Sequence, residues 1–174
     1  MFSVGLKVIA VIAVFIWQIS FVSSLPWPWF YFNFIIITLV TLLLVADFSA
    51  VGWAALLSAV LLDIYSADFF GLNIISLLGA AVVTYFSLLK FFTNRSLYSF
   101  IFLTLIATTS YEIFKASLQW LAHFIGSNGQ TQFIFSRYNF IHWGYEAAAN
   151  MVAILIIFYL INYFSRRLKA FFIR

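Results

Sequence analysis

The sequence predicts an all-α integral membrane protein with six transmembrane helices joined by short loops. Hydrophobic residues make up 66% of the 174-residue chain and charged residues only 8%, whereas charged residues are about a quarter of a soluble domain. One span needs about 20 residues, so the chain has room for about six spans and little else. We therefore expect a single polytopic membrane domain over residues 1–174.

The composition also excludes several classes of function. The chain contains no cysteine, which excludes disulfides, thiolate catalysis and cysteine metal sites. It has no phosphate-binding glycine loop, no HExxH and no GxSxG motif, so we predict a protein that is not an enzyme and has no cofactor. The net charge of +4 is concentrated near the ends of the predicted spans. That distribution is typical of membrane topology and does not favour nucleic-acid binding.

The first two spans are predicted at about 6–24 and 30–46. Lys7 precedes the first apolar run, so a cleaved signal peptide is the alternative interpretation. The run is long for a signal peptide, and further spans follow it. Between the two spans, the sequence PWPW at residues 26–29 combines helix-ending prolines with tryptophans that prefer the lipid–water interface. We predict a short turn at the membrane surface.

The third and fourth spans, at about 53–66 and 72–92, are predicted to form a helical hairpin. A turn at residues 47–52 precedes it. Asp63 lies near the end of the third span, and a carboxylate there is costly if it faces lipid, so it should face protein or surface water. Gly71 permits a tight turn or a close helix contact. Small and weakly polar residues share one face of the fourth span and favour close helix packing: Asn73, Ser76, Ala80, Thr84 and Ser87.

The last two spans are predicted at about 98–124 and 139–164. The longest polar loop, Gly126–Gln132, lies between them. After the last span, the tail at residues 165–174 mixes basic and apolar residues. Two interpretations remain open for this tail, a short amphipathic helix along the membrane surface and a simple run of basic stop-transfer residues.

The basic residues predict the orientation. With six spans, one side of the membrane carries most of the loop and tail cations: Lys7, Lys90, Arg95, Arg166, Arg167, Lys169 and Arg174. Only Arg137 falls on the other side. The positive-inside rule then places both termini in the cytoplasm of a multi-pass protein. The PWPW turn, the Asp68 turn and the long polar loop would face outward.

Polar residues within the last two spans predict an intramembrane network. On the fifth span, one stripe covers roughly a third of the helix circumference: Thr104, Thr108, Glu112, Lys115, Gln119 and His123. The sixth span has a matching stripe: Asn139, His142, Glu146 and Asn150. Such stripes face the bundle interior or a water-filled cavity.

From the matched depth of the two stripes, we expect Lys115 to pair with Glu146, with Glu112 as a second acceptor. The pair favours a structural role, and proton transfer between the carboxylates is the alternative. His123 and His142 are both near the outer surface, but no third metal ligand is evident, so no metal site is predicted.

The hairpin sequence AVLLDIYSADFFGL, at residues 59–72, resembles the signature of the rod shape-determining protein MreD family. Asp63, Ser66 and Gly71 match that signature in identity and spacing. Ala59, Ala67 and Phe69 depart from the residues usual in the family. The six-span plan and the basic tail also fit the resemblance.

The resemblance implies a non-enzymatic scaffold of the bacterial inner membrane that supports cell shape and lateral peptidoglycan synthesis. Its partners would be the bitopic protein MreC and, through it, MreB, RodA and a class B penicillin-binding protein. The family is similar in fold to the substrate-binding subunits of energy-coupling factor vitamin transporters, which provide the alternative function. The AxxxA pattern typical of those subunits is missing here, because the first span has only Ala10 and Ala13.

With short loops, a protein partner would be met mainly through the helices or through the rim of a loop. Two segments are candidate contacts because we expect them to be exposed. One is the turn with Asp68, Phe69 and Phe70, and the other is the long loop before Arg137.

Overall fold

The computed structural model describes residues 4–45, 48–91, 96–126 and 137–172, and within these ranges it contains helices and no strand. The helices are α1 (Val4–Ser20), η1 (Val22–Ser24), η2 (Trp29–Tyr31), α2 (Phe34–Val45), α3 (Phe48–Tyr65), α4 (Leu72–Phe91), α5 (Leu97–Gly126) and α6 (Arg137–Phe172). Four of them, α3 to α6, are long and apolar enough to cross a membrane. The apolar helices α1 and α2 are shorter. The architecture is therefore all-helical, with four helices of the length and composition that a membrane protein needs to span the bilayer.

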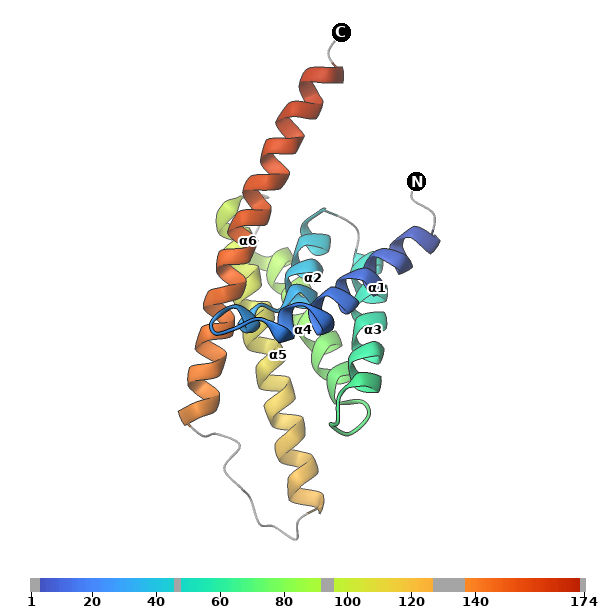
Figure 1. Cartoon of the computed structure of the whole chain (residues 1–174), viewed down its shortest axis with the longest axis vertical. Helices are drawn as coiled ribbons and strands as arrows, with labels where there is room; N and C mark the ends of the chain where they lie inside the picture. The colour runs from blue at the N-terminus through green and yellow to red at the C-terminus, as the bar shows by residue number, and fades with distance from the viewer. Residues whose placement is uncertain (1–3, 46–47, 92–95, 127–136, 173–174) are drawn as a thin grey trace.

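The helices form a bundle whose two ends differ (Figure 1). The N-terminal end of α1 and the C-terminal ends of α2, α4 and α6 lie toward one end, at the top of the view. The α3–α4 turn, the end of α5 and the start of α6 lie toward the other. The connection between α1 and α2 lies at neither end. It sits about halfway along the bundle, where α1 arrives after crossing the other helices obliquely.

One predicted turn needs correction. The turn predicted at residues 47–52 is wrong from residue 48 onward, because α3 begins at Phe48. Gly52 lies inside this helix with no atom within 4 Å of where a Cβ would be. The segment at residues 26–29, predicted as a short turn at the membrane surface, connects α1 to α2 and lies beside α6, with Trp27 against the ring of Tyr145. In contrast, α4 begins at the residue predicted.

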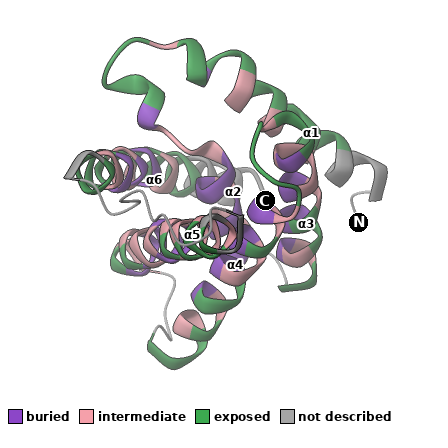
Figure 2. Ribbon diagram, turned by 90° about the horizontal axis from the view of Figure 1, so that it is seen from below, coloured by how far each residue is buried: buried purple, intermediate pink, exposed green. Residues whose placement is uncertain are grey.

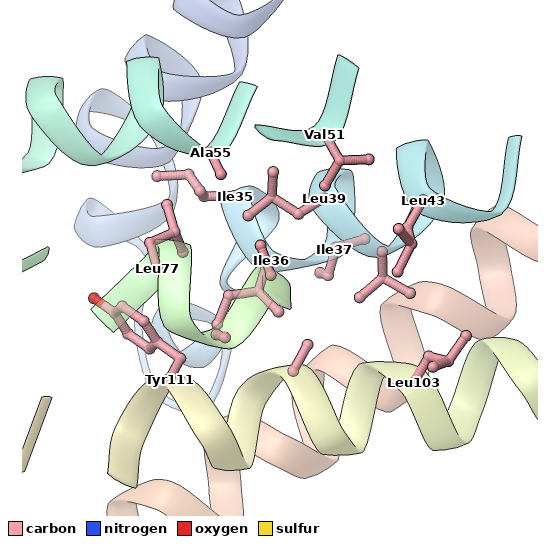
Figure 3. Packing of buried hydrophobic residues seen from close by; sticks show 14 of the residues in the cluster. Ile35, Ile36, Ile37, Leu39, Leu43, Val51, Ala55, Leu77, Leu103 and Tyr111 are labelled. Carbon is pink, nitrogen blue, oxygen red and sulfur yellow. The ribbon is translucent and has the colours of Figure 1, made fainter. Parts of the chain in front are cut away.

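The centre of the bundle is α2, which is apolar around its whole circumference. A helix of this kind is stable only when other helices surround it. Ile36, Ile37 and Val40 are each about 1% exposed, and they pack among residues of α3, α4 and α5 (Figure 3). The burial colours show the same arrangement, with the purple residues turned inward around α2 (Figure 2).

The small-residue face of α4 packs against α5, as the sequence predicted. Ser76, Ala80 and Thr84 are buried. Gly79 lies so close to α5 that an added Cβ would be 2.9 Å from the ring of Phe114. The absence of a side chain at Gly79 lets the Phe114 ring of α5 lie directly on α4, and small residues permit such close helix contacts within membranes.

The basic tail continues α6 without a break through Phe172. The structure therefore has one long helix here and no separate surface helix within residues 137–172.

Candidate functional site

The α3–α4 turn is organised by the buried carboxylate of Asp63, near the end of α3. Its two oxygens accept hydrogen bonds from the backbone N–H groups of Gly71 (2.9 Å), Asn73 (2.8 Å) and Ile74 (3.3 Å). The first N–H groups of a helix have no partner within the helix, and they form its positive end. Asp63, at the end of the preceding helix, therefore provides acceptors for the first N–H groups of α4. Its negative charge lies at the positive end of the α4 dipole.

Gly71 and Ser66 complete this turn. Gly71 has a φ of +102°, a conformation that only glycine adopts readily. The Ser66 hydroxyl accepts a hydrogen bond from Asn73 Nδ2 (3.3 Å), and the Tyr111 hydroxyl of α5 donates to Asn73 Oδ1 (3.0 Å). The structure thus brings Asp63, Ser66 and Gly71 together, and it ties their turn to α5.

The tip of the turn is exposed. Asp68 is exposed, and the side chains of Phe69 and Phe70 are 44% and 70% exposed. The turn is therefore fixed from within while its tip points away from the bundle.

A second polar cluster is built around Asn33, which precedes α2. Its backbone N–H donates to Asn150 Oδ1 (2.8 Å), and its Nδ2 donates to Glu146 Oε1 (3.0 Å). Its own Oδ1 accepts from the N–H of Ile36 (3.3 Å), which is the geometry of a helix N-cap. Asn150 also donates to Thr108 Oγ1 of α5 (3.2 Å). One asparagine therefore starts α2 and links it to α6, and through Asn150 to α5.

Gln18 of α1 forms hydrogen bonds at the same place, the start of α2. Its Nε2 donates to the Phe32 carbonyl (2.9 Å), and its Oε1 accepts from the N–H of Phe34 (2.8 Å). Sequence reasoning missed both Gln18 and Asn33. The signal available was that they are the only two side-chain amides among residues 1–45.

The predicted α5–α6 network is formed in part. Glu146 and Asn150 are buried, and Glu112 is close enough to interact electrostatically with Glu146. The closest described partner of Glu146 is Asn33, however, and Lys115 acts on Glu146 through a longer-range attraction. The Lys115 ammonium lies over the ring of Tyr111, 5.9 Å from its centroid.

The other predicted members of the network are less connected. Gln119 is half-buried on α5. The side chain of His123 is outside the described part of the structure. His142 packs against Tyr31, with ring centroids 4.8 Å apart. Within the described residues, no three acidic, histidine or cysteine side chains are grouped as a metal site would need.

The interior between α2 and its neighbours leaves little space. A cavity lined by Ile36, Leu77, Ala107 and other apolar groups has a volume of about 10 Å³, which holds at most one water molecule. Comparisons with protein-family models, curated proteins and solved structures find no match for this chain. Its function must therefore be argued from these two clusters and the exposed surfaces beside them.

Proposed function

We propose that this chain is a non-enzymatic membrane scaffold of the bacterial cell-elongation machinery, as its resemblance to the MreD family implies. It would bind an MreC-like bitopic protein and thereby support cell shape and lateral peptidoglycan synthesis. The observation that carries the proposal is the α3–α4 turn. The three residues that match the family signature, Asp63, Ser66 and Gly71, form one hydrogen-bonded unit, and this unit displays an exposed tip.

A fixed turn with an exposed aromatic tip suits protein binding. Ordering Phe69 and Phe70 before a partner arrives reduces the entropy lost on binding, and exposed aromatic residues provide much of the binding energy at protein interfaces. The polar clusters also support this role, because their hydrogen bonds hold helices together: Asn33 binds Asn150 of α6, and Asp63 binds the start of α4.

The cavity beside α2 is too small to be a vitamin site. A vitamin would need a pocket of several hundred cubic ångströms, whereas the cavity beside α2 has a volume of about 10 Å³. The transporter subunit remains the second candidate, and the experiment below separates the two.

The proposed location is the bacterial inner membrane, with both termini in the cytoplasm. Lys90 and the basic part of α6 belong to the same end of the bundle as the start of α1, and cytoplasmic loops carry an excess of such cations. This orientation does not depend on whether α1 and α2 each cross the membrane, because zero or two crossings leave the termini on the same side.

The test is to purify tagged protein gently from its native membrane and identify what accompanies it by mass spectrometry. The test variant replaces Phe69 and Phe70 with serine. The control is Phe91→Ser, which changes an exposed aromatic (74% exposed) at the opposite end of α4. We expect the wild type and the control to retain an MreC-like protein. The double variant should be present at the same level as the wild type but should recover at least tenfold less of that partner.

Equal recovery of the partner from all three proteins would reject the turn as the contact. Recovery of an energy-coupling ATPase pair, or of a vitamin in stoichiometric amount, would reject the scaffold and support the transporter subunit.

A further inference from the structure

The connection between α1 and α2, residues 21–33, places irregular backbone at the middle of the membrane. Asn33 is hydrogen-bonded to Asn150, and Asn150 to Thr108. Both of these partners lie near the middle of the apolar stretches of their helices, Asn139–Tyr163 and Leu97–Ala122. With 12 residues, α2 is about 18 Å long, whereas the hydrocarbon core is about 30 Å thick. Therefore α2 begins near mid-membrane, and α1 and α2 form a hairpin that enters and returns on one side.

This connection leaves backbone acceptors without partners. Within the described residues, no hydrogen bond reaches the carbonyl oxygens of Ser23, Ser24, Leu25 and Trp27. Non-helical backbone at this depth is tolerated only where other protein or a water-filled cavity surrounds it, because lipid cannot form the missing hydrogen bonds.

The described part of the chain leaves the connection largely exposed. Trp27 is 63% exposed and Trp29 is 55% exposed, and Ser23 and Ser24 are exposed as well. Viewed along the bundle, the connection swings outward as an arc of mostly exposed residues between α1 and α6 (Figure 2). The described residues therefore leave this arc to be covered by another group.

We propose that an uncharged transmembrane helix of a partner protein, bearing serine or threonine hydroxyls, packs on residues 21–30. The charge pattern selects this occupant, because residues 9–34 contain no acidic or basic residue and no histidine. Within the described residues, the unpartnered groups also include the backbone N–H groups of Trp27 and Phe30, while Pro26 and Pro28 provide no N–H. The partner must therefore supply groups that both donate and accept, and uncharged side chains such as hydroxyls form hydrogen bonds between helices in membranes. This inference rests on the proposed function and assigns the surface that the single helix of the bitopic partner uses.

The depth of the connection is tested first by cysteine labelling. The chain has no cysteine, so Ser24→Cys and Ala67→Cys each introduce a single thiol at an exposed position. In intact cells and in inverted vesicles, a membrane-impermeant maleimide should label Ala67→Cys from one side. It should label Ser24→Cys from neither side until the membrane is dissolved in SDS. Labelling of Ser24→Cys to the same extent as Ala67→Cys would place the connection in water and overturn the proposal.

The occupant is tested by photocrosslinking in the native membrane. A benzoylphenylalanine replaces Trp27 in one variant, and in the control it replaces Trp53, which is 69% exposed on α3. We expect the Trp27 variant alone to cross-link to a second polypeptide, at a peptide within an uncharged transmembrane helix. Cross-links to a second copy of this chain, to a soluble segment or only to lipid would overturn the proposal.

The identity of the cross-linked protein keeps this result separate from the proposed function. A cross-linked helix from a protein outside the elongation machinery would support the surface and reject the scaffold role. Recovery of an MreC-like protein without a cross-link from residue 27 would support the scaffold role and reject residues 21–30 as the contact surface.

Discussion

The starts of α2 and α4 both need hydrogen-bond acceptors, and different side chains provide them. Both helices begin away from the bundle end where the termini lie, and both need partners for their first backbone N–H groups. At α4 a charged group from the end of the preceding helix, Asp63, accepts hydrogen bonds from three N–H groups over a short stretch of sequence. At α2 neutral amides do so, and the link from Asn33 to Asn150 joins residues 117 positions apart.

The difference shows what each connection depends on. The α3–α4 turn is local, so the hairpin carries its own cap and leaves its tip free. The α1–α2 connection is held only when α1, α5 and α6 are already in place, because Gln18, Thr108 and Asn150 each belong to a different helix. We infer that the hairpin is the independent unit and that α2 is positioned by the assembled bundle.

The largest effect should come from Asp63→Ala. This change leaves three buried N–H groups without an acceptor, and a hydrogen bond to a charged group contributes about 1.5–3 kcal/mol. We expect a loss of at least about 3 kcal/mol in the free energy of unfolding, seen as a large fall in melting temperature in detergent or as absence of folded protein. Asp68→Ala, at the exposed tip, is the control and should change little. Similar melting temperatures for the two variants would show that the carboxylate does not hold the turn.

An intermediate effect is expected from Asn33→Ala, which removes the α2 cap and the bond to Glu146. The cap alone contributes about 1 kcal/mol, and the second bond adds about 1 kcal/mol. Combination with Gln18→Ala should be non-additive, because both side chains bind residues around the same helix start, whereas combination with Asp63→Asn should be additive. Thermal unfolding of the single and double variants measures both couplings. Equal coupling in the two pairs would contradict the independence of the two connections.

The smallest change in stability is expected from replacing single glycines with alanine. Gly71→Ala should cost about 1–2 kcal/mol, since its positive φ disfavours a side chain, and no neighbouring atom lies within 4 Å to add a clash. Gly52→Ala is equally free of neighbours but lies in helix α3, where alanine is favoured by about 1 kcal/mol. The two variants should therefore change the melting temperature in opposite directions. If both melting temperatures changed in the same direction, backbone conformation would not be the cause of the changes.

The same contrast explains how much could be predicted from the sequence. The hairpin was predictable because its signals are local: a carboxylate near a helix end, a glycine, and small residues spaced along α4. The start of α3 was missed because Ser49 and Gly52 indicate a turn in a soluble protein, whereas glycine is common within membrane helices.

The path of residues 21–33 could not be predicted in this way. Tryptophan next to proline favours the membrane surface, and the sequence gives no sign of the hydrogen bond that joins Asn33 to Asn150 in the middle of α6. The partner of Glu146 was missed for a similar reason. The matched depth of the stripes on α5 and α6 predicted Lys115 as the partner of Glu146. The residue that forms a hydrogen bond with Glu146 is Asn33, which comes from a third segment whose depth the sequence did not indicate.

The length of α6 has a consequence for whatever meets this protein outside the bilayer. Its apolar stretch ends at Tyr163, but the helix continues through Phe172, which adds about 14 Å at 1.5 Å per residue. A continuous helix transmits position and rotation, which a flexible tether does not. A molecule that binds this extension would be held at a set height above the membrane and at a set angle around the axis, so the insertion of a single residue within it would rotate that molecule by about 100°.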